Sequence, residues 1–95
     1  MLKIVKAELP QCNVLILKGE ILMENEAELK RKVYDLAEMS DLPIVLDMRN
    51  VDFMDSAGLG TLVNMMYDFI NRGRPLKIHR PNPMLETLIN GFIHH

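Results

Sequence analysis

Hydrophobic and polar residues alternate near the start of this chain and then recur at longer intervals. Alternation over residues 3–9 predicts a β-strand, Pro10 and Gln11 supply a turn, and the aliphatic run 14–17 predicts a second strand that ends at Gly19. Two neighbouring strands joined by so short a turn pair as a hairpin. We therefore expect the chain to open with a β-hairpin.

Helical spacing of apolar residues begins at Asn25 and predicts a first helix over residues 25–39. Its apolar stripe is formed by Leu29, Val33, Leu36 and Ala37. Asn25, followed three residues later by Glu28, resembles a capping box. Glu24, Glu26 and Glu28 complement the positive end of the helix dipole, which favours a structural role for them over an acidic binding site.

A short apolar run in the middle of the chain predicts the third strand. Pro43 precedes this run, which covers residues 44–46, and residues 47–54 are dotted with acidic side chains and predict a connection. A continuous apolar run is typical of a strand that helices cover on both faces. We therefore expect this strand at the centre of the sheet, between two layers of helices.

The last third of the chain predicts a helix, a strand and a helix. The first of these ends at Arg72, and its stripe is formed by Leu59, Leu62, Val63, Met66 and Ile70. Residues 76–78 predict a fourth strand. Asn82 as N-cap, Pro83 at the first helical position and Gly91 as terminator predict a short third helix with an apolar face of Leu85, Leu88 and Ile89.

The order of these elements predicts an α/β fold. Strand, strand, helix, strand, helix, strand, helix is the order of a small mixed sheet of about four strands with three or more helices packed on it. Ninety-five residues suffice for one compact core and leave little for another. We expect residues 1–95 to form a single domain.

Composition and charge narrow the class of protein. The chain is 48% hydrophobic and 25% charged, with a net charge of −2 and no basic segment, so the sequence does not favour direct binding of nucleic acid. The longest aliphatic run is too short to span a bilayer, and residues 1–6 lack the features of a secretory signal. Cys12 has no second cysteine to pair with. We expect a cytoplasmic protein with a protein partner.

The segment with the most candidate chemistry is Asp55-Ser56-Ala57-Gly58-Leu59-Gly60, at the junction of the third strand and the second helix. It places a hydroxyl between a carboxylate and a glycine-rich helix start. A hydrolase elbow needs glycine where Met54 stands, and neither His79 nor the terminal pair His94-His95 has an evident reason to act as base for Ser56. The glycines also lack the Lys-Ser/Thr ending of a phosphate-binding loop. Two roles remain for this segment: a cap of the helix, or a site where a phosphate is attached covalently.

Two further groups of residues have structural and functional interpretations. Asp47, Asp52 and Asp55 could collect a divalent cation, but no segment has calcium-loop spacing, so turns and caps explain them better. Methionine side chains fill irregular spaces in cores and also contact partners. For Met23, Met65 and Met66 the core interpretation is favoured.

Segments spread over nearly the whole chain match one known pattern. They are residues 19–21, 45–47, 55–60, 72–78 and 82–92. With these segments the chain resembles the STAS family, and within it the bacterial anti-sigma factor antagonists. Relatives usually continue beyond the Gly-Phe of the last segment, so the resemblance leaves open what covers the sheet edge and the last helix.

The resemblance implies a function that is switched by phosphorylation. A partner that is both anti-sigma factor and serine kinase would bind the unphosphorylated chain, release a sigma factor and phosphorylate Ser56, and a serine phosphatase would reverse this. The implied partner contacts are Gly19, Glu20, Met54, Asp55, Ala57, Gly58 and Leu59. A monomer with no cofactor, no metal and no enzymatic activity suffices for this role.

The physics of a helix start fits such a switch. Unpaired backbone N–H groups and the positive dipole end would accommodate a phosphate on Ser56. Gly58 and Gly60 would leave the backbone bare for a partner. Three alternatives remain: Asp55 or Ser56 only caps the helix, the chain is an unmodified STAS scaffold in a lipid-transport or other cytoplasmic complex, or it is a small enzyme that uses Ser56 or the aspartates.

Overall fold

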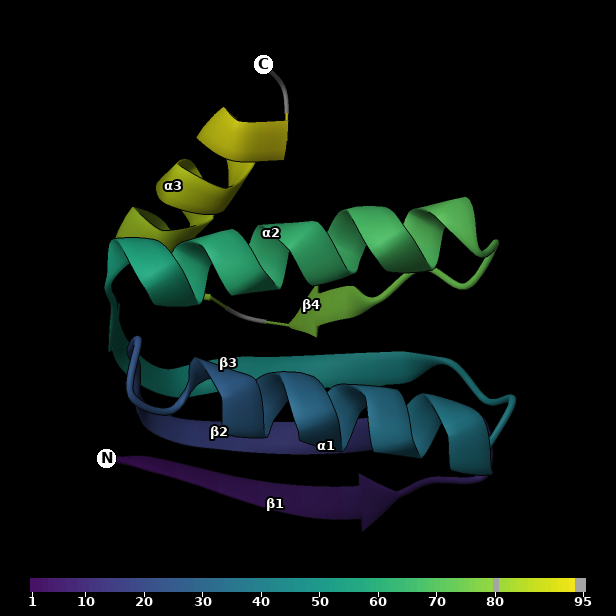
Figure 1. Cartoon of the computed structure of the whole chain (residues 1–95). Helices are drawn as coiled ribbons and strands as arrows, with labels where there is room; N and C mark the ends of the chain where they lie inside the picture. The colour runs from purple at the N-terminus through teal and green to yellow at the C-terminus, as the bar shows by residue number, and fades with distance from the viewer. Residues whose placement is uncertain (80, 94–95) are drawn as a thin grey trace.

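The computed structural model describes residues 1–79 and 81–93, which form one sheet and a set of helices (Figure 1). Within these residues there are four strands and three helices: β1 (Leu2–Glu8), β2 (Asn13–Ile21), α1 (Glu26–Met39), β3 (Ile44–Met54), α2 (Ser56–Asn71), β4 (Lys77–His79) and α3 (Pro83–Ile93). The strands lie in the order β1-β2-β3-β4. β1 is antiparallel to β2, whereas β2, β3 and β4 are parallel. The predicted mixed α/β sheet is confirmed.

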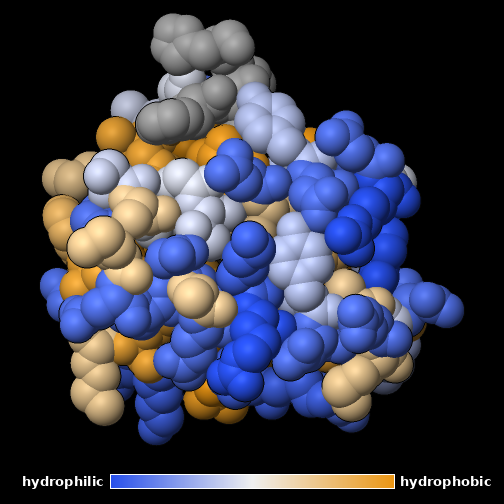
Figure 2. Space-filling model, viewed as in Figure 1, coloured by the Kyte–Doolittle hydropathy of each residue, from blue (hydrophilic) through white to orange (hydrophobic). Residues whose placement is uncertain are grey.

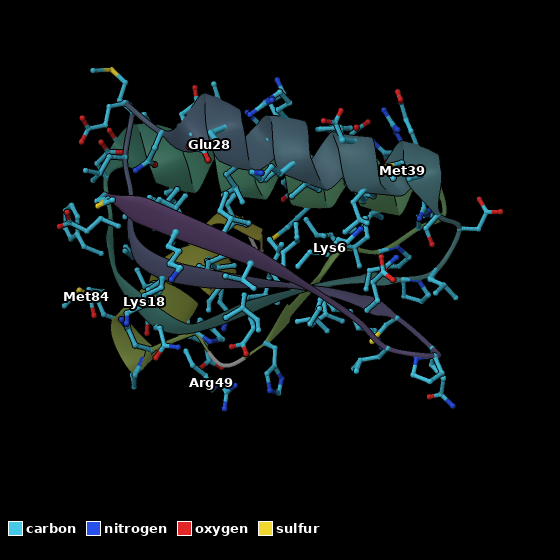
Figure 3. The ribbon with its side chains drawn as sticks, turned by 90° about the horizontal axis from the view of Figure 1, so that it is seen from below. Lys6, Lys18, Glu28, Met39, Arg49 and Met84 are labelled. Atoms are coloured by element: carbon cyan, nitrogen blue, oxygen red, sulfur yellow. The ribbon has the colours of Figure 1, made fainter. Side chains whose placement is uncertain are left out.

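Helices α1 and α2 lie side by side on one face of the sheet (Figures 1 and 3). The core between them and the sheet includes Leu17 and Leu46 from the strands and Leu29 and Leu62 from the helices, all without exposed surface. The outer surface above this core is largely hydrophilic (Figure 2). Helix α3 lies next to α2 beyond the β4 edge.

Strand β3 is central, as predicted, but helices cover only one of its faces. Ile44, Leu46 and Met48 point into the core, whereas Val45 and Asp47 point to the opposite face, where the described part of the chain places no helix. The expectation of two helical layers is therefore wrong. An apolar run of three residues cannot distinguish the two arrangements, because alternate residues need cover on different faces.

Strand β3 is also longer than predicted. It continues through residues 47–54, which the sequence assigned to a connection, and stays paired with β2 as far as Met54. Two register irregularities accompany the polar residues of this stretch, each adding one residue to β3. Since β2 is itself nine residues long, it offers backbone partners to residues whose side chains favour a loop.

The helices differ from the prediction at their ends and in the stripe of α2. Asn25 makes no side-chain capping bond, so the capping box is wrong; its amide instead joins the Leu22 N–H and the Glu20 carbonyl. In α2 the buried stripe includes Phe69, while Ile70 is 53% exposed. For α3, the Asn82 cap is confirmed, because its Oδ1 accepts from an N–H of the first turn at 2.9 Å. Gly91 does not end α3, which runs to Ile93.

Polar contacts fix α1 and α2 relative to each other. The Tyr34 hydroxyl on α1 donates to Asp68 on α2 at 2.6 Å, and Arg72 pairs with Asp68 at 3.2 Å. These contacts, the Tyr34 hydrogen bond first, hold the pKa of Asp68 below its usual value. The guanidinium of Arg74 reaches back to carbonyl oxygens at the C-terminal end of α1, at Ala37 and Ser40. The pair of helices is thus fixed as one layer.

Candidate functional site

Asp55 links the end of β3 to the start of α2 and to a distant loop. It has an extended backbone, with φ −84° and ψ 179°, and is the N-cap of α2. One carboxylate oxygen accepts the Gly58 N–H at 2.8 Å, and the other accepts the Met23 N–H at 2.9 Å. These backbone bonds, Gly58 first, lower the pKa of Asp55. The predicted helix cap is confirmed, and the same side chain also holds the β2–α1 loop in place.

Ser56 is the first residue of α2 and its side chain is exposed. The chain has three other serine and threonine residues, Ser40, Thr61 and Thr87. Ser40 Oγ accepts an N–H from Leu42, the Thr61 hydroxyl donates to Glu26, and the Thr87 hydroxyl donates to a backbone carbonyl. Among the described residues Ser56 is the one hydroxyl of this kind that no hydrogen bond holds.

The glycines after Ser56 have different roles. Gly58 is buried, and a Cβ added to it would overlap the backbone carbonyl of Ile21 at the end of β2. The same carbonyl accepts the Asp55 N–H at 3.2 Å. The prediction that the Gly58 backbone is accessible to a partner is therefore wrong, since the space beside its Cα is filled by Ile21. Gly60 has no atom within 4 Å of the position a Cβ would take, so its surface is free.

The other predicted partner contacts divide into buried and accessible residues. Met54 and Leu59 are only 5% and 6% exposed and belong to the core, so we correct their assignment from contact to support. Gly19 has a φ of +111° and lies against the Met1 carbonyl, so its requirement for glycine is structural. Glu20 and Ala57 are partly exposed and, with Asp55 and Ser56, can be reached from outside.

Two exposed apolar residues lie at this end of the sheet, and the sequence favoured neither of them as a partner contact. Met23, which the sequence assigned to the core, is 74% exposed, and its backbone is tied to Asp55. Phe53 is 48% exposed and is paired with Glu20 just before the end of β3. The available signal was their position, since both stand next to turns rather than inside a periodic apolar stripe. Met65, by contrast, is 1% exposed and part of the core, as predicted.

The aspartates do not converge on a cation site. Asp47 is buried and its carboxylate faces the Arg49 guanidinium at 2.9 Å, and these hydrogen bonds are the main reason that the pKa of Asp47 is low. Asp55 is engaged with backbone N–H groups, and Asp52 is exposed. In residues 1–79 and 81–93 no group of three acidic, histidine or cysteine side chains is placed to hold a metal. His94 and His95 lie outside the described residues.

The fold is similar to several solved structures. The anti-sigma factor antagonist SpoIIAA in its unphosphorylated form has a TM-score of 0.75 at 17% identity, over 93% of this chain and 82% of that one. An anti-sigma factor antagonist from Mycobacterium paratuberculosis has a TM-score of 0.77 at 19% identity, over 99% of this chain and 81% of that one. At such identities these likenesses describe the fold alone.

The same fold also occurs inside a larger protein. The murine Solute Carrier 26 family member A9 anion transporter matches with a TM-score of 0.73 at 18% identity, over 90% of this chain but 14% of the transporter. In this chain none of the described helices is long and apolar enough to cross a membrane. A family model for the STAS domain matches residues 3–93, and the chain therefore belongs to the STAS domain family.

Proposed function

We propose that this STAS domain is an anti-sigma factor antagonist whose binding is switched off by phosphorylation of Ser56. In the unphosphorylated form it binds an anti-sigma factor with serine kinase activity and so releases a sigma factor. The observation that carries the proposal is the free, exposed hydroxyl of Ser56 on a helix start that Asp55 and Gly58 hold rigidly. A kinase can reach this hydroxyl without unfolding the domain.

The surroundings of Ser56 make an added charge effective. Asp55 carries a negative charge at neutral pH, and backbone hydrogen bonds hold its pKa below the usual carboxyl value. A phosphoserine adds about 1.5 to 2 negative charges beside it. Facing one partner carboxylate at ~4 Å and an effective dielectric of ~20, each of those charges costs roughly 4 kcal/mol before screening. If screening halves this cost, about two added charges still cost roughly 4 kcal/mol. Since about 1.4 kcal/mol is a tenfold change in affinity, the complex is weakened several hundredfold.

Apolar side chains near Ser56 provide the contact surface that such a complex needs. Met23 and Phe53 are exposed at the same end of the sheet, and Ala57 is partly exposed beside Ser56. Flexible methionine and rigid phenylalanine side chains are typical anchors of protein interfaces. We propose that these residues, together with Glu20 and Asp55, contact the anti-sigma factor, and that Met54, Gly58 and Leu59 support them from inside.

The proposal is tested by phosphorylation with the cognate anti-sigma kinase. After incubation with ATP, intact mass should show one added phosphate on the wild type and on Ser40→Ala, the matched control that removes the other serine. Ser56→Ala should gain none. No phosphate on the wild type, or the same gain on Ser56→Ala, contradicts the assignment.

The same role requires little beyond the domain itself. We propose that residues 1–95 act in the cytoplasm as one domain, without cofactor or metal, and as a non-enzymatic monomer that a serine phosphatase resets. Binding of purified anti-sigma factor should have a 1:1 stoichiometry and should survive EDTA. A stoichiometry of two chains per partner would contradict the monomer.

A second candidate is a constitutive scaffold, in which Ser56 is never modified. It is favoured by the occurrence of the same fold as a small part of a murine anion transporter. As the cytoplasmic STAS subunit of a lipid-transport complex, the chain would recover transporter ATPase subunits in a pull-down, equally well with Ser56→Ala and Ser56→Glu. Loss of binding with Ser56→Glu alone would instead favour the phosphorylation switch.

A further inference from the structure

The sheet face opposite α1 and α2 combines an aliphatic centre with a cationic rim. Strand register places side chains in rows across it: Ala7, Val14, Val45 and Lys77 form one row, and Val5, Ile16, Asp47 and His79 form the next. Lys3 and Lys18 form the start of a third row. We call these residues, with Arg49, the open face. Figure 3 shows Arg49 on this side of the sheet, opposite α1 and α2.

The open face is unusual because three of its four strands are parallel. β2, β3 and β4 form a parallel unit, and parallel sheets normally have both faces covered by helices. Here Val5 is 44% exposed, and Val14, Ile16 and Val45 are only partly covered. These β-branched side chains resemble the inside of an α/β sheet more than its surface. The face is therefore chemically suited to one more helical layer.

Charge indicates what kind of helix would fit. Lys3, Lys18, Arg49 and Lys77 give this side of the sheet four cations against two carboxylates, that of Asp47 and, at the end of β2, that of Glu20. The resulting +2 contrasts with −2 for the whole chain, which leaves −4 for the rest of the molecule. Asp47 is already paired with Arg49, and Glu20 with the N-terminal amine. Within the described residues none of the three lysines forms an ion pair, so they are available to an acidic partner.

The open face also disfavours other occupants. In a face-to-face dimer the same cations would oppose each other, which costs affinity. Apart from Val5, the aliphatic side chains of the open face are partly covered, so they offer little to insert into a membrane. Single-stranded nucleic acid binds on aromatic stacking platforms, whereas the central strip, Val5, Ala7, Val14, Ile16 and Val45, is aliphatic.

We infer that the open face is a second docking surface, which binds an amphipathic helix of a partner protein whose apolar stripe is flanked by acidic residues. Four strands span about 14 Å between the outer strands, and a helix is about 10 Å wide, so one helix fills the face. Ser56 stands at the end of the sheet and not on this face. The domain can therefore hold an anchoring partner while Ser56 switches another.

A defined peptide tests this inference, whichever protein supplies the helix in the cell. The probe is a helical peptide of about 18 residues, roughly five turns, with a leucine stripe flanked by glutamates, and its twin carries lysines instead. NMR titration of the isotope-labelled domain should shift amides of β1, β2 and β3 around Val5, Ile16 and Val45. The acidic peptide should bind at least tenfold more tightly than the twin.

Matched charge reversals locate the binding. Lys18→Glu/Lys77→Glu on the open face should weaken the acidic peptide more than tenfold, whereas Lys30→Glu/Arg31→Glu on α1 makes the same charge change and should alter it less than twofold. Val5→Thr keeps the β-branched shape, removes apolar surface and should weaken binding about threefold. Ser56→Glu should leave it unchanged, which separates this surface from the proposed switch.

Three results would overturn the inference. They are amide shifts that map to α1, equal weakening by both charge-reversed pairs, and co-sedimentation with phosphatidylglycerol vesicles in the absence of peptide binding. The last result would assign the cations to an anionic membrane surface instead.

Discussion

Each end of helix α2 is held by a charged side chain of its own, and the two arrangements differ in what they hold. At the start, Asp55 accepts two backbone N–H groups from different segments. After its end, Arg74 donates to carbonyl oxygens of residues 37, 40 and 42. The first arrangement leaves Ser56 and Met23 exposed next to it. Hydrogen bonds between a charged side chain and the backbone therefore fix both ends of α2, and at its start they do so without using the Ser56 hydroxyl.

The largest effect is expected where the backbone of α2 touches β2. Gly58→Ala places a methyl group onto the backbone carbonyl of Ile21. Neither the Cβ nor the carbonyl can rotate away as a flexible side chain would, so the helix start must move. We expect a loss of about 3 kcal/mol in the free energy of unfolding, measured by urea denaturation. Gly60→Ala is the matched control: its surroundings are open, and alanine should stabilise the helix by up to about 1 kcal/mol. Equal effects of the two changes would show that the close approach at Gly58 does not limit stability.

The next effect concerns the opposite end of the helix pair. Arg74→Met keeps the aliphatic stem and leaves the carbonyls at the end of α1 without their donor. We expect a loss of about 2 kcal/mol, seen as a lower urea midpoint at unchanged slope. Arg31→Met, on the exposed face of α1, should change stability by less than about 0.5 kcal/mol. If both variants have the same urea midpoint, the hydrogen bonds of Arg74 to the end of α1 do not stabilise the fold.

A smaller, pH-dependent effect is expected from Asp55. Its pKa is lowered in the folded state by the N–H groups of Gly58 and Met23. The ionised form therefore stabilises the fold at pH values above the unfolded pKa of about 3.9, and this contribution disappears as pH falls through the lower folded value. Asp55→Asn should lower the Tm at pH 7 by about 5 °C and by less at acid pH. Because the pKa values of Asp47 and Asp68 are also lowered, the Tm of Asp55→Asn should still fall as the pH is lowered, but less steeply than that of the wild type.

The smallest effect on stability should come from the residue that matters most for the proposed switch. Ser56→Ala removes an exposed hydroxyl that holds no contact, so the free energy of unfolding should change by less than about 0.5 kcal/mol. Calorimetry should give the wild-type Tm within error. A clear loss of stability would mean that the hydroxyl is structural and would weaken its role as phosphoacceptor.

Much of the candidate site could be predicted from local sequence. The cap at Asp55, the exposed Ser56 and the cap at Asn82 all depend on atoms within four residues of each other. Met23 was assigned wrongly, because a methionine between a strand and a helix has no periodicity to show which way it points. The buried positions of Met54, Gly58 and Leu59 depend on where β2 and α1 lie, and a linear motif does not contain that information.

The sequence by itself determined the order of strands and helices, the mixed sheet and the helix cap at Asp55, because hydrophobic periodicity and capping are local properties of the chain. Only the tertiary structure decided that β3 continues to Met54, that Gly58 meets the Ile21 carbonyl and that one face of the parallel strands stays open. Each of these depends on backbone from a distant segment, whose hydrogen bonds and excluded volume override the local preference of the residues.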